Sequence, residues 1–396
     1  MFVEFWPVGA NNPVTLPMSP ESISGHLLAD WTPSLPPSAA SSFMGWPSFL
    51  IEPTTFLDTE LLALADEATH AERQWKVFFS WMLGVAGTRH VLADDGYRWL
   101  APLSAFYPEA QQEIDLTRWH PDFPRSVLTA ARRPERLSNL RPDYVALRST
   151  ASPGSYDWAI AESKGTQACL TNAQSCPTPW RNQVRSVQLT RNGSVLAIPR
   201  HLVVATRVNP NAVRLSTRRL QVRAWNSTAT PEGNLMPEAA VEIAAAHLFG
   251  IFRNLGLRAN AQAIAWSVQM RADARRQHGQ SSMKRQVDEL AANAAAELAA
   301  SEDANIEEEE DGRKPLVVFA PTDIGPVEVA ISSLIVDFAR DLLITDNSDA
   351  AAEALRETDG KLDKWQQLQN SKTRDSSTVI LPFGVRVTLP SRFRHR

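Results

Sequence analysis

Cysteine, lysine and long apolar runs are all scarce in this chain, and two of these shortages exclude classes of protein. The 396 residues include only two cysteines, Cys169 and Cys176, too few for a disulfide framework or a four-cysteine zinc site. No stretch reaches the roughly 18 consecutive apolar residues of a membrane span, and the opening MFVEFWPVGANNPV lacks the pattern of a secretory signal. We therefore expect a protein of the cytoplasm that does not associate with a membrane.

Acidic residues are missing from residues 163–231, although the chain as a whole is slightly acidic. This segment holds ten lysines and arginines and no Asp or Glu, so it carries +10 and leaves -14 for the rest of a chain with a net charge of -4. Neutralisation of phosphates by arginine is the sequence-independent part of nucleic-acid binding. We expect the segment to bind a polyanion; the alternative is that its arginines pair with acids elsewhere in the chain.

The composition is that of a globular protein with room for more than one core. Hydrophobic residues make up 43% and charged residues 21% of the chain, and at roughly 100–200 residues per domain the length predicts two or three domains. Residues 1–55 hold nine of the 27 prolines, which disfavours helix and central strand and predicts an irregular arm that buries its aromatic side chains. Residues 56–230 predict an α/β domain. Residues 231–396 predict an alanine-rich, mainly helical α+β region with an accessory or oligomerisation role.

Hydrophobic periodicity and turn residues predict the individual elements. A helix is expected over residues 56–82, ended by Gly84 and Gly87, and a hairpin is considered for residues 91–103. The central region then follows the order strand, strand, helix, strand, which is typical of an α/β fold. The other predictions are strands at 144–148, 158–163, 201–208 and 316–320, helices at 180–189, 237–255, about 260–300 and 329–343, and a strand pair within 377–390.

The residues that could carry chemistry lie around a single lysine. Only seven of the 40 basic residues are lysine, and Lys164 is the only one between Lys76 and Lys284. Lys164 lies at the end of a predicted strand, two residues after Glu162, and because side chains alternate across a strand the two emerge on the same face. Asp143 stands at the start of the neighbouring predicted strand. The three side chains can therefore converge on one point.

Such a convergence suits the cleavage of phosphodiesters. Two carboxylates can hold a hard divalent cation, typically Mg²⁺. The cation polarises a phosphoryl oxygen and makes a water more acidic, while the lysine can position or deprotonate that water and offset charge growing on the phosphate. The alternative without a function is that Glu162 and Lys164 form a surface salt bridge, worth about 0–1 kcal/mol.

The segments RPDYVAL and WAIAESKGT resemble the PD-(D/E)XK, or restriction-endonuclease-like, nuclease superfamily. The resemblance covers roughly residues 56–210 and implies a restriction-endonuclease-like core, a mixed sheet flanked by helices. By motif position it implies that Asp143, Glu162 and Lys164 are the catalytic set and that Asp143 and Glu162 bind Mg²⁺ or Mn²⁺. The flanking regions resemble nothing that we recognise.

Two further parts of the family pattern have candidates in this chain. Family members commonly add an acid from a helix before the core, for which Glu72 is the candidate, ahead of Glu60 and Glu67. They often carry a glutamine on the helix after the lysine, for which Gln183 is favoured over Gln188. The alternative is that neither residue has a function: Glu72 would lie at the edge of its helix with its carboxylate in water, and Gln183 would be exposed on its helix. The residues expected to bind nucleic acid are Arg181, Gln183, Arg185, Arg218 and Arg219.

The chain contains a second acid-x-lysine triplet and a second Pro-Asp pair, and neither fits the motif as well. About one acid two residues before a lysine is expected by chance, and a second triplet exists at Asp359-Gly360-Lys361, but it follows a polar helical stretch with no strand before it. A second Pro-Asp pair at Asp122 is followed by Pro124, which prevents a regular strand. No phosphate-binding loop, dinucleotide fingerprint, zinc-protease motif or nucleophile elbow occurs. His201 precedes a strand, and a lone histidine there is usually structural.

We therefore expect a metal-dependent endonuclease, a phosphodiester hydrolase that acts on DNA rather than RNA. Family association alone points to bacterial or phage-related (antiviral) defence or to DNA processing. The alternative is a nuclease-fold module of little or no activity that binds nucleic acid or a partner protein within a larger assembly. Residues 231–396 would then mediate a homo-oligomer or contact that partner.

Overall fold

The structure is a computed structural model, and it describes residues 2–19, 22–23, 25–27, 73–108, 113–119, 142–150, 152, 155–167, 170, 175–207, 219–229, 235–274, 292–293, 296, 314–320, 327–345, 347–372 and 378–388. It combines strands and helices in a mixed α/β fold, as the order of elements in the sequence predicts.

The largest sheet contains seven strands within this described part of the chain, in the order β2-β1-β11-β10-β7-β6-β3. Strand β7 lies near its middle, antiparallel to β6 and parallel to β10, and β1 is parallel to β11. The strands are β1 (Phe2–Trp6), β2 (Val14–Pro17), β3 (Trp99–Pro102), β6 (Tyr144–Ser149), β7 (Tyr156–Thr166), β10 (Arg200–Arg207) and β11 (Gln221–Ala229).

Two smaller sheets complete the β structure. One has the order β4-β5-β8-β9 and is formed by β4 (Phe106–Pro108), β5 (Glu113–Trp119), β8 (Gln188–Arg191) and β9 (Ser194–Val195). The other has the order β12-β13-β15-β14 and is formed by β12 (Leu316–Ala320), β13 (Val327–Ile331), β14 (Thr378–Leu381) and β15 (Val385–Thr388).

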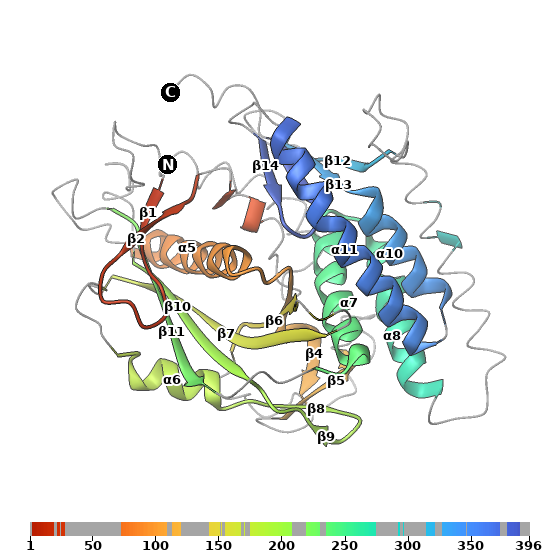
Figure 1. The fold of residues 1–396 in the computed structure, drawn as a ribbon, viewed down its shortest axis with the longest axis horizontal. Helices are drawn as coiled ribbons and strands as arrows, with labels where there is room; N and C mark the ends of the chain where they lie inside the picture. Colours follow the sequence, from red (N-terminus) through yellow and green to blue (C-terminus); the bar gives the residue numbers. More distant parts are fainter. Residues whose placement is uncertain are drawn as a thin grey trace.

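Helices cover the large sheet on both faces (Figure 1). Helix α5 lies on one face, and α6 and α7 pack with the core on the other. The side of the molecule away from the β1–β2 hairpin is built mostly from α7, α8, α10 and α11, as Figure 1 shows. The helices are α5 (Arg73–Asp94), α6 (Thr178–Arg185), α7 (Pro237–Asn254), α8 (Arg258–Ala274), α10 (Ser333–Ile344) and α11 (Ser348–Lys372), with a 3-10 turn, η1 (Leu103–Ala105).

The alternation of side chains along β7 decides which helix each residue meets. Ala159 and Ala161 pack in the cluster that contains Leu92 of α5, whereas Trp158 and Ile160 pack in the cluster that contains Val184 of α6. Because residues two apart on a strand share a face, Glu162 and Lys164 point to the α6 side. Strand β7 thus separates the candidate site from α5.

Helix α5 corrects one prediction. Gly84 and Gly87 were expected to end the helix, but α5 continues through both to Asp94. A Cβ atom on Gly84 would lie 2.6 Å from the backbone nitrogen of Gly165 in β7, and one on Gly87 would lie 2.2 Å from Oγ1 of Thr206 in β10. The two glycines therefore allow the helix to approach the sheet closely rather than stopping it. Residues 56–72 of the predicted helix lie outside the described residues.

Two expectations for the N-terminal half are also wrong in part. Residues 91–103 form no hairpin: α5 ends at Asp94, Gly96 turns the chain with φ +83°, and β3 pairs with β6 instead. The start of the predicted irregular arm is regular, because β1 extends the large sheet beside β11 and buries Trp6. The remainder of that arm, including Trp31, Trp46 and Phe49, lies outside the described residues.

The C-terminal third follows most of its sequence pattern. Helix α7 begins at Pro237 and is followed by Gly256 in a left-handed conformation, and strands β12, β14 and β15 are confirmed. The predicted helix 329–343 instead starts as β13 and becomes helical only at Ser333, after Ser332 caps α10. Likewise, the predicted helix 180–189 ends at Arg185, and its last residues enter β8.

One continuous hydrophobic cluster extends from Trp99 to Val387 and includes side chains from all three sheets. Strand β3 packs against α7, so residues on both sides of position 230 contribute to this core. The division into regions 1–55, 56–230 and 231–396 stays a prediction. No helix in the described ranges is long and apolar enough to span a lipid bilayer.

Candidate active site

The antiparallel pairing of β6 and β7 brings Asp143 next to Glu162. Tyr144 is the register partner of Ala161, and the backbone nitrogen of Asp143 donates to the carbonyl of Ala161 at 3.1 Å. Asp143 therefore stands opposite Glu162, at the distance of about 4.5–5.5 Å between Cβ atoms that is usual for cross-strand neighbours. The two predicted metal ligands share one face of the sheet.

The Asp143 carboxylate is fixed by the motif strand itself. Its Oδ2 accepts a hydrogen bond of 2.7 Å from the backbone nitrogen of Ser163, the residue between Glu162 and Lys164. The backbone carbonyl of Asp143 accepts a second bond from the nitrogen of Leu103, at the end of β3. Asp143 is thereby held at the junction of three neighbouring strands.

The Glu162 carboxylate is almost completely buried, with 1% of the residue exposed. Its Oε1 forms an ion pair with Nζ of Lys164, while its Oε2 is buried without a hydrogen-bond partner among the described residues. Burial, and after it the nearby Asp143 charge, raise the pKa of Glu162 to about 8 against the opposing effect of Lys164. A buried carboxylate with an unsatisfied oxygen costs free energy and is retained where it has a task.

Lys164 connects this carboxylate pair to helix α6. Its Nζ donates a hydrogen bond of 2.8 Å to Oε1 of Gln183 and also pairs with Glu162. The side chain is 23% exposed, so solvent reaches part of it. The structure thus brings together Asp143, Glu162, Lys164 and Gln183, all of which the sequence or the family resemblance singles out.

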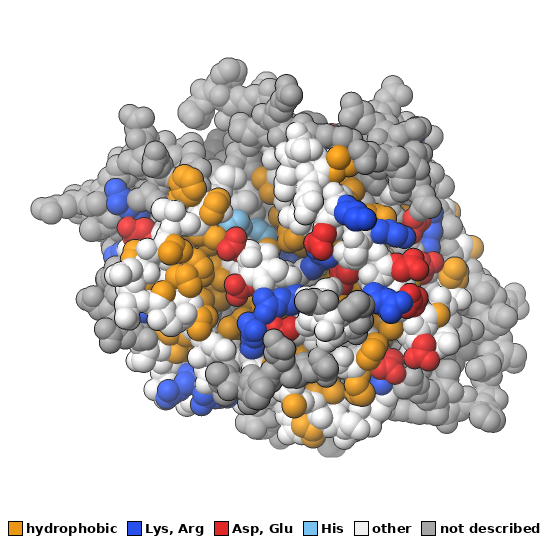
Figure 2. Space-filling view, in the orientation of Figure 1, with side chains coloured by type: hydrophobic (Ala, Val, Ile, Leu, Met, Phe, Trp, Pro, Cys, Tyr) orange, Lys and Arg blue, Asp and Glu red, His pale blue; other side chains and the backbone are white. Residues whose placement is uncertain are grey.

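The arginines predicted to bind nucleic acid lie on and near α6. Arg185 is exposed and donates to the backbone carbonyl and the hydroxyl of Ser227 on β11, and Arg181 donates to Thr178 at 3.4 Å. Figure 2 shows a group of basic side chains over α6, at the lower left. Arg219 is half-buried and forms an isolated β-bridge just before β11.

Two predicted site residues, Glu72 and Arg218, lie outside the described residues. The described part of α5 covers the face of the sheet opposite to Glu162 and Lys164.

The residues present suit a hard divalent cation. Asp143 and Glu162 supply carboxylate oxygens, and the unsatisfied Oε2 of Glu162 is the kind of atom that a cation would complete. Mg²⁺ keeps several waters and is often bound through one or two carboxylates, so two acids are enough for it. Within the described ranges, no cluster of three or more His, Cys, Asp or Glu side chains could hold a metal ion.

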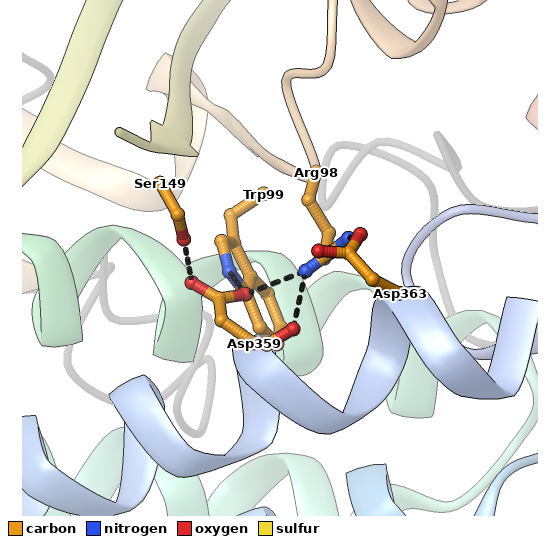
Figure 3. Close-up of polar contacts among 5 residues, drawn as sticks. All are labelled: Arg98, Trp99, Ser149, Asp359 and Asp363. Carbon is orange, nitrogen blue, oxygen red and sulfur yellow. Dashed lines mark hydrogen bonds and ion pairs between the residues drawn. The ribbon is translucent and has the colours of Figure 1, made fainter. Parts of the chain in front are cut away.

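The second acid-x-lysine triplet forms a different kind of cluster. Asp359, Gly360 and Lys361 lie inside α11, as their polar helical surroundings predict. The Asp359 carboxylate is buried and accepts hydrogen bonds from Arg98, Trp99 and Ser149 (Figure 3). Sequence reasoning missed this cluster, because an acid in a polar stretch is expected to face water.

The structure gives neither His201 nor Cys176 a role in the candidate site. His201 is the second residue of β10 and is half-buried, and burial, followed by the charge of Arg185, lowers the pKa of the histidine. Cys176 is a free thiol before α6, and burial raises its pKa to about 11, so it is not an activated nucleophile. Cys169 lies outside the described residues.

Comparison of the chain with protein-family models, with curated proteins and with solved structures gave no significant match. The site must therefore be interpreted from its own geometry.

Proposed function

We propose that this protein is a metal-dependent nuclease that hydrolyses phosphodiester bonds in DNA, with a restriction-endonuclease-like core built on β6, β7, α6 and β10. The observation that carries the proposal is the convergence of Asp143, Glu162 and Lys164 on one face of adjacent strands. A surface salt bridge between Glu162 and Lys164 does not account for this arrangement, because Glu162 is buried and has a second acid beside it.

Asp143 and Glu162 would hold Mg²⁺ or Mn²⁺. Bound there, the cation would polarise a phosphoryl oxygen and lower the pKa of a water. Asp143 is oriented for this task by the backbone nitrogen of Ser163, and Glu162 keeps Oε2 available. The raised pKa of Glu162 means that this side chain gives up a proton when it takes up a cation near neutral pH.

Lys164 would act on the attacking water and on the phosphate. Its Nζ is held between Glu162 and Gln183, which fixes it close to the carboxylate pair. From there it can orient a water or offset negative charge on the phosphate oxygens. Gln183 positions the amine through the 2.8 Å hydrogen bond rather than reacting itself.

Arg181 and Arg185 of the acid-free segment would bind the phosphates of the backbone, whereas Arg191 and Arg200 of the same segment form ion pairs with Glu242 and Asp157. Arg181 and Arg185 lie on the helix that carries Gln183, so a backbone bound along α6 would run past the carboxylates. Contacts of this kind give salt-dependent affinity without base specificity. A role in bacterial or phage-related defence or in DNA processing fits such an enzyme.

The test combines cleavage and binding assays on the purified protein with Mg²⁺ or Mn²⁺. Asp143→Asn is expected to abolish cleavage and weaken metal binding, while DNA affinity and its salt dependence stay unchanged. Arg185→Ala is the complementary variant and should weaken DNA binding with little effect on metal affinity. If the native protein binds no divalent cation and cleaves nothing, the proposal fails, and a binding module of the same fold remains.

A further inference from the structure

Helix α5 touches β7 backbone against backbone, directly behind the candidate site. A Cβ atom on Gly84 would lie 2.6 Å from the nitrogen of Gly165 and 2.9 Å from the carbonyl carbon of Lys164. A Cβ atom on Gly165 would lie only 1.9 Å from the carbonyl oxygen of Ser80. No methyl group fits at either position unless the helix and the strand move apart.

This contact falls on the peptide that joins Lys164 to Gly165. The Lys164 side chain leaves the opposite face of β7, where its Nζ meets Glu162 and Gln183. The position of the Lys164 backbone therefore depends on how closely α5 packs against one face of β7. The position of its amine depends on Gln183 of α6 on the opposite face. Main-chain atoms cannot rotate away as a flexible side chain does, so a change behind the strand is transmitted to the front.

We propose that Gly84 is a positioning residue for Lys164: its missing side chain lets α5 set the strand at the depth that places the amine between Glu162 and Gln183. The catalytic consequence rests on the proposed nuclease function. The geometric part does not, because the position of the Lys164 amine can be measured without any reaction. Even a displacement of about 1 Å can lower the rate of an enzyme by roughly 100-fold.

The chain supplies matched controls for the loss of a glycine. Gly250 in α7 and Gly360 in α11 are also inside helices, and a Cβ atom at either would meet nothing within 4 Å. Alanine at these two positions should leave the fold unchanged or stabilise it slightly. Gly87 is intermediate, because its Cβ would meet the Thr206 side chain rather than backbone.

The experiment reads the lysine amines directly. Reductive ¹³C-methylation keeps the charge of each amine, and with only seven lysines in the chain the Lys164 signal is assignable in NMR spectra by comparison with Lys164→Arg. The expected result is that Gly84→Ala shifts the Lys164 signal, while Gly250→Ala and Gly360→Ala leave it in place. In parallel, Gly84→Ala should lower kcat for cleavage by roughly 10- to 100-fold with KM changed less than about twofold.

The outcomes separate the positioning claim from the nuclease claim. If Gly84→Ala loses stability while the Lys164 signal and kcat stay at their native values, Gly84 has only a packing role and the inference is overturned. If the native protein shows no cleavage, the NMR shift alone decides the geometric part. Should Gly84→Ala fail to fold, Gly87→Ala replaces it and is expected to shift the Lys164 signal in the same direction by less; an unmoved signal would then contradict the inference.

Discussion

Two acid-x-lysine triplets in one chain have opposite structural fates. Glu162-Ser163-Lys164 lies on β7, where residues two apart share a face, and its lysine pairs with its acid. Asp359-Gly360-Lys361 lies in α11, where residues two apart do not face each other, so Lys361 pairs with Glu357 four residues away. The same spacing therefore brings the acid and the lysine together on the strand and keeps them apart on the helix.

The two buried acids also differ in how their oxygens are satisfied. Both oxygens of Asp359 have donors: Oδ1 accepts from Arg98 and Trp99, and Oδ2 accepts from Ser149 (Figure 3). Glu162 has a second acid beside it and an oxygen without a described partner. Burial raises the pKa of both groups, but only Asp359 is surrounded by what a structural carboxylate needs. Glu162, whose Oε2 has no described hydrogen-bond partner, is therefore the better candidate for function.

The surroundings of the two lysines differ in the same way. Figure 2 shows acidic and basic side chains intermixed over α11, where Lys361 and Glu357 are both about 60% exposed. Such exposed pairs contribute little to stability. Lys164, by contrast, is largely enclosed by its two partners.

The largest expected effect separates the two lysines by activity. Lys164→Ala should lower the cleavage rate by roughly 100- to 10,000-fold, because it removes a group that acts on the water or the phosphate. Lys361→Ala removes an exposed ion pair and should leave the rate unchanged. Initial rates with Mg²⁺ on a plasmid or oligonucleotide substrate make the measurement. Equal rates for native protein and Lys164→Ala would remove Lys164 from the mechanism.

The next effect separates the two acids by stability. Asp359→Ala should lower the free energy of unfolding by about 3–5 kcal/mol, because it leaves Trp99 and Ser149 without their acceptor and the buried Arg98 guanidinium with the exposed Asp363 as its carboxylate partner. Glu162→Gln should cost almost nothing or stabilise the metal-free protein, because it replaces a carboxyl group whose charged form burial disfavours by a neutral amide of the same shape. Urea unfolding monitored by circular dichroism measures both. If Glu162→Gln is as destabilising as Asp359→Ala, Glu162 is a structural carboxylate like Asp359 and the distinction between them is wrong.

The pH dependence of stability sharpens the assignment of Glu162. Its pKa is raised from 4.5 to about 8 in the folded protein, so its contribution to stability is complete below pH 4.5 and is lost as the pH rises towards 8. In that window, the native protein should lose about 1 kcal/mol per pH unit relative to Glu162→Gln. Unfolding curves of both proteins without metal, recorded from pH 5 to pH 8.5, give the difference. If the unfolding free energies of both proteins depend on pH in the same way, burial does not raise the pKa of Glu162.

The smallest expected effect concerns a single donor to Asp359. Ser149→Ala removes the hydrogen bond to Oδ2 and leaves those to Oδ1 in place, so we expect a loss of about 1–2 kcal/mol. The conservative Ser149→Thr keeps the hydroxyl and serves as the control. Thermal unfolding at one pH is sufficient to compare them. No loss in Ser149→Ala would mean that water replaces the hydroxyl, although the Asp359 carboxylate itself is buried.

Local sequence rules were enough to bring Asp143, Glu162 and Lys164 together, because strand alternation and a short hairpin fix their faces and register. Gln183 required the family resemblance, since nothing in its own helix distinguishes it from an exposed residue. The roles of these residues stay a proposal. What the structure establishes is that they meet.

Other features depend on partners that are distant in the sequence. Gly84 looks like a helix stop until Gly165 is placed beside it, and Phe2–Trp6 looks irregular until β11 is placed beside it. Asp359 looks exposed until Arg98 and Ser149, more than 200 residues earlier, are found around it. Each of these residues takes its role from tertiary contacts, which local propensity and periodicity do not contain.

The central claim is that Asp143 and Glu162 share one divalent cation, and a crystal structure with Mn²⁺ tests it most directly. An anomalous difference peak should lie within about 2–2.5 Å of an oxygen from each carboxylate, and it should disappear in Glu162→Gln. Mn²⁺ found only elsewhere, or carboxylates of residues 143 and 162 on opposite faces of the sheet, would contradict the account.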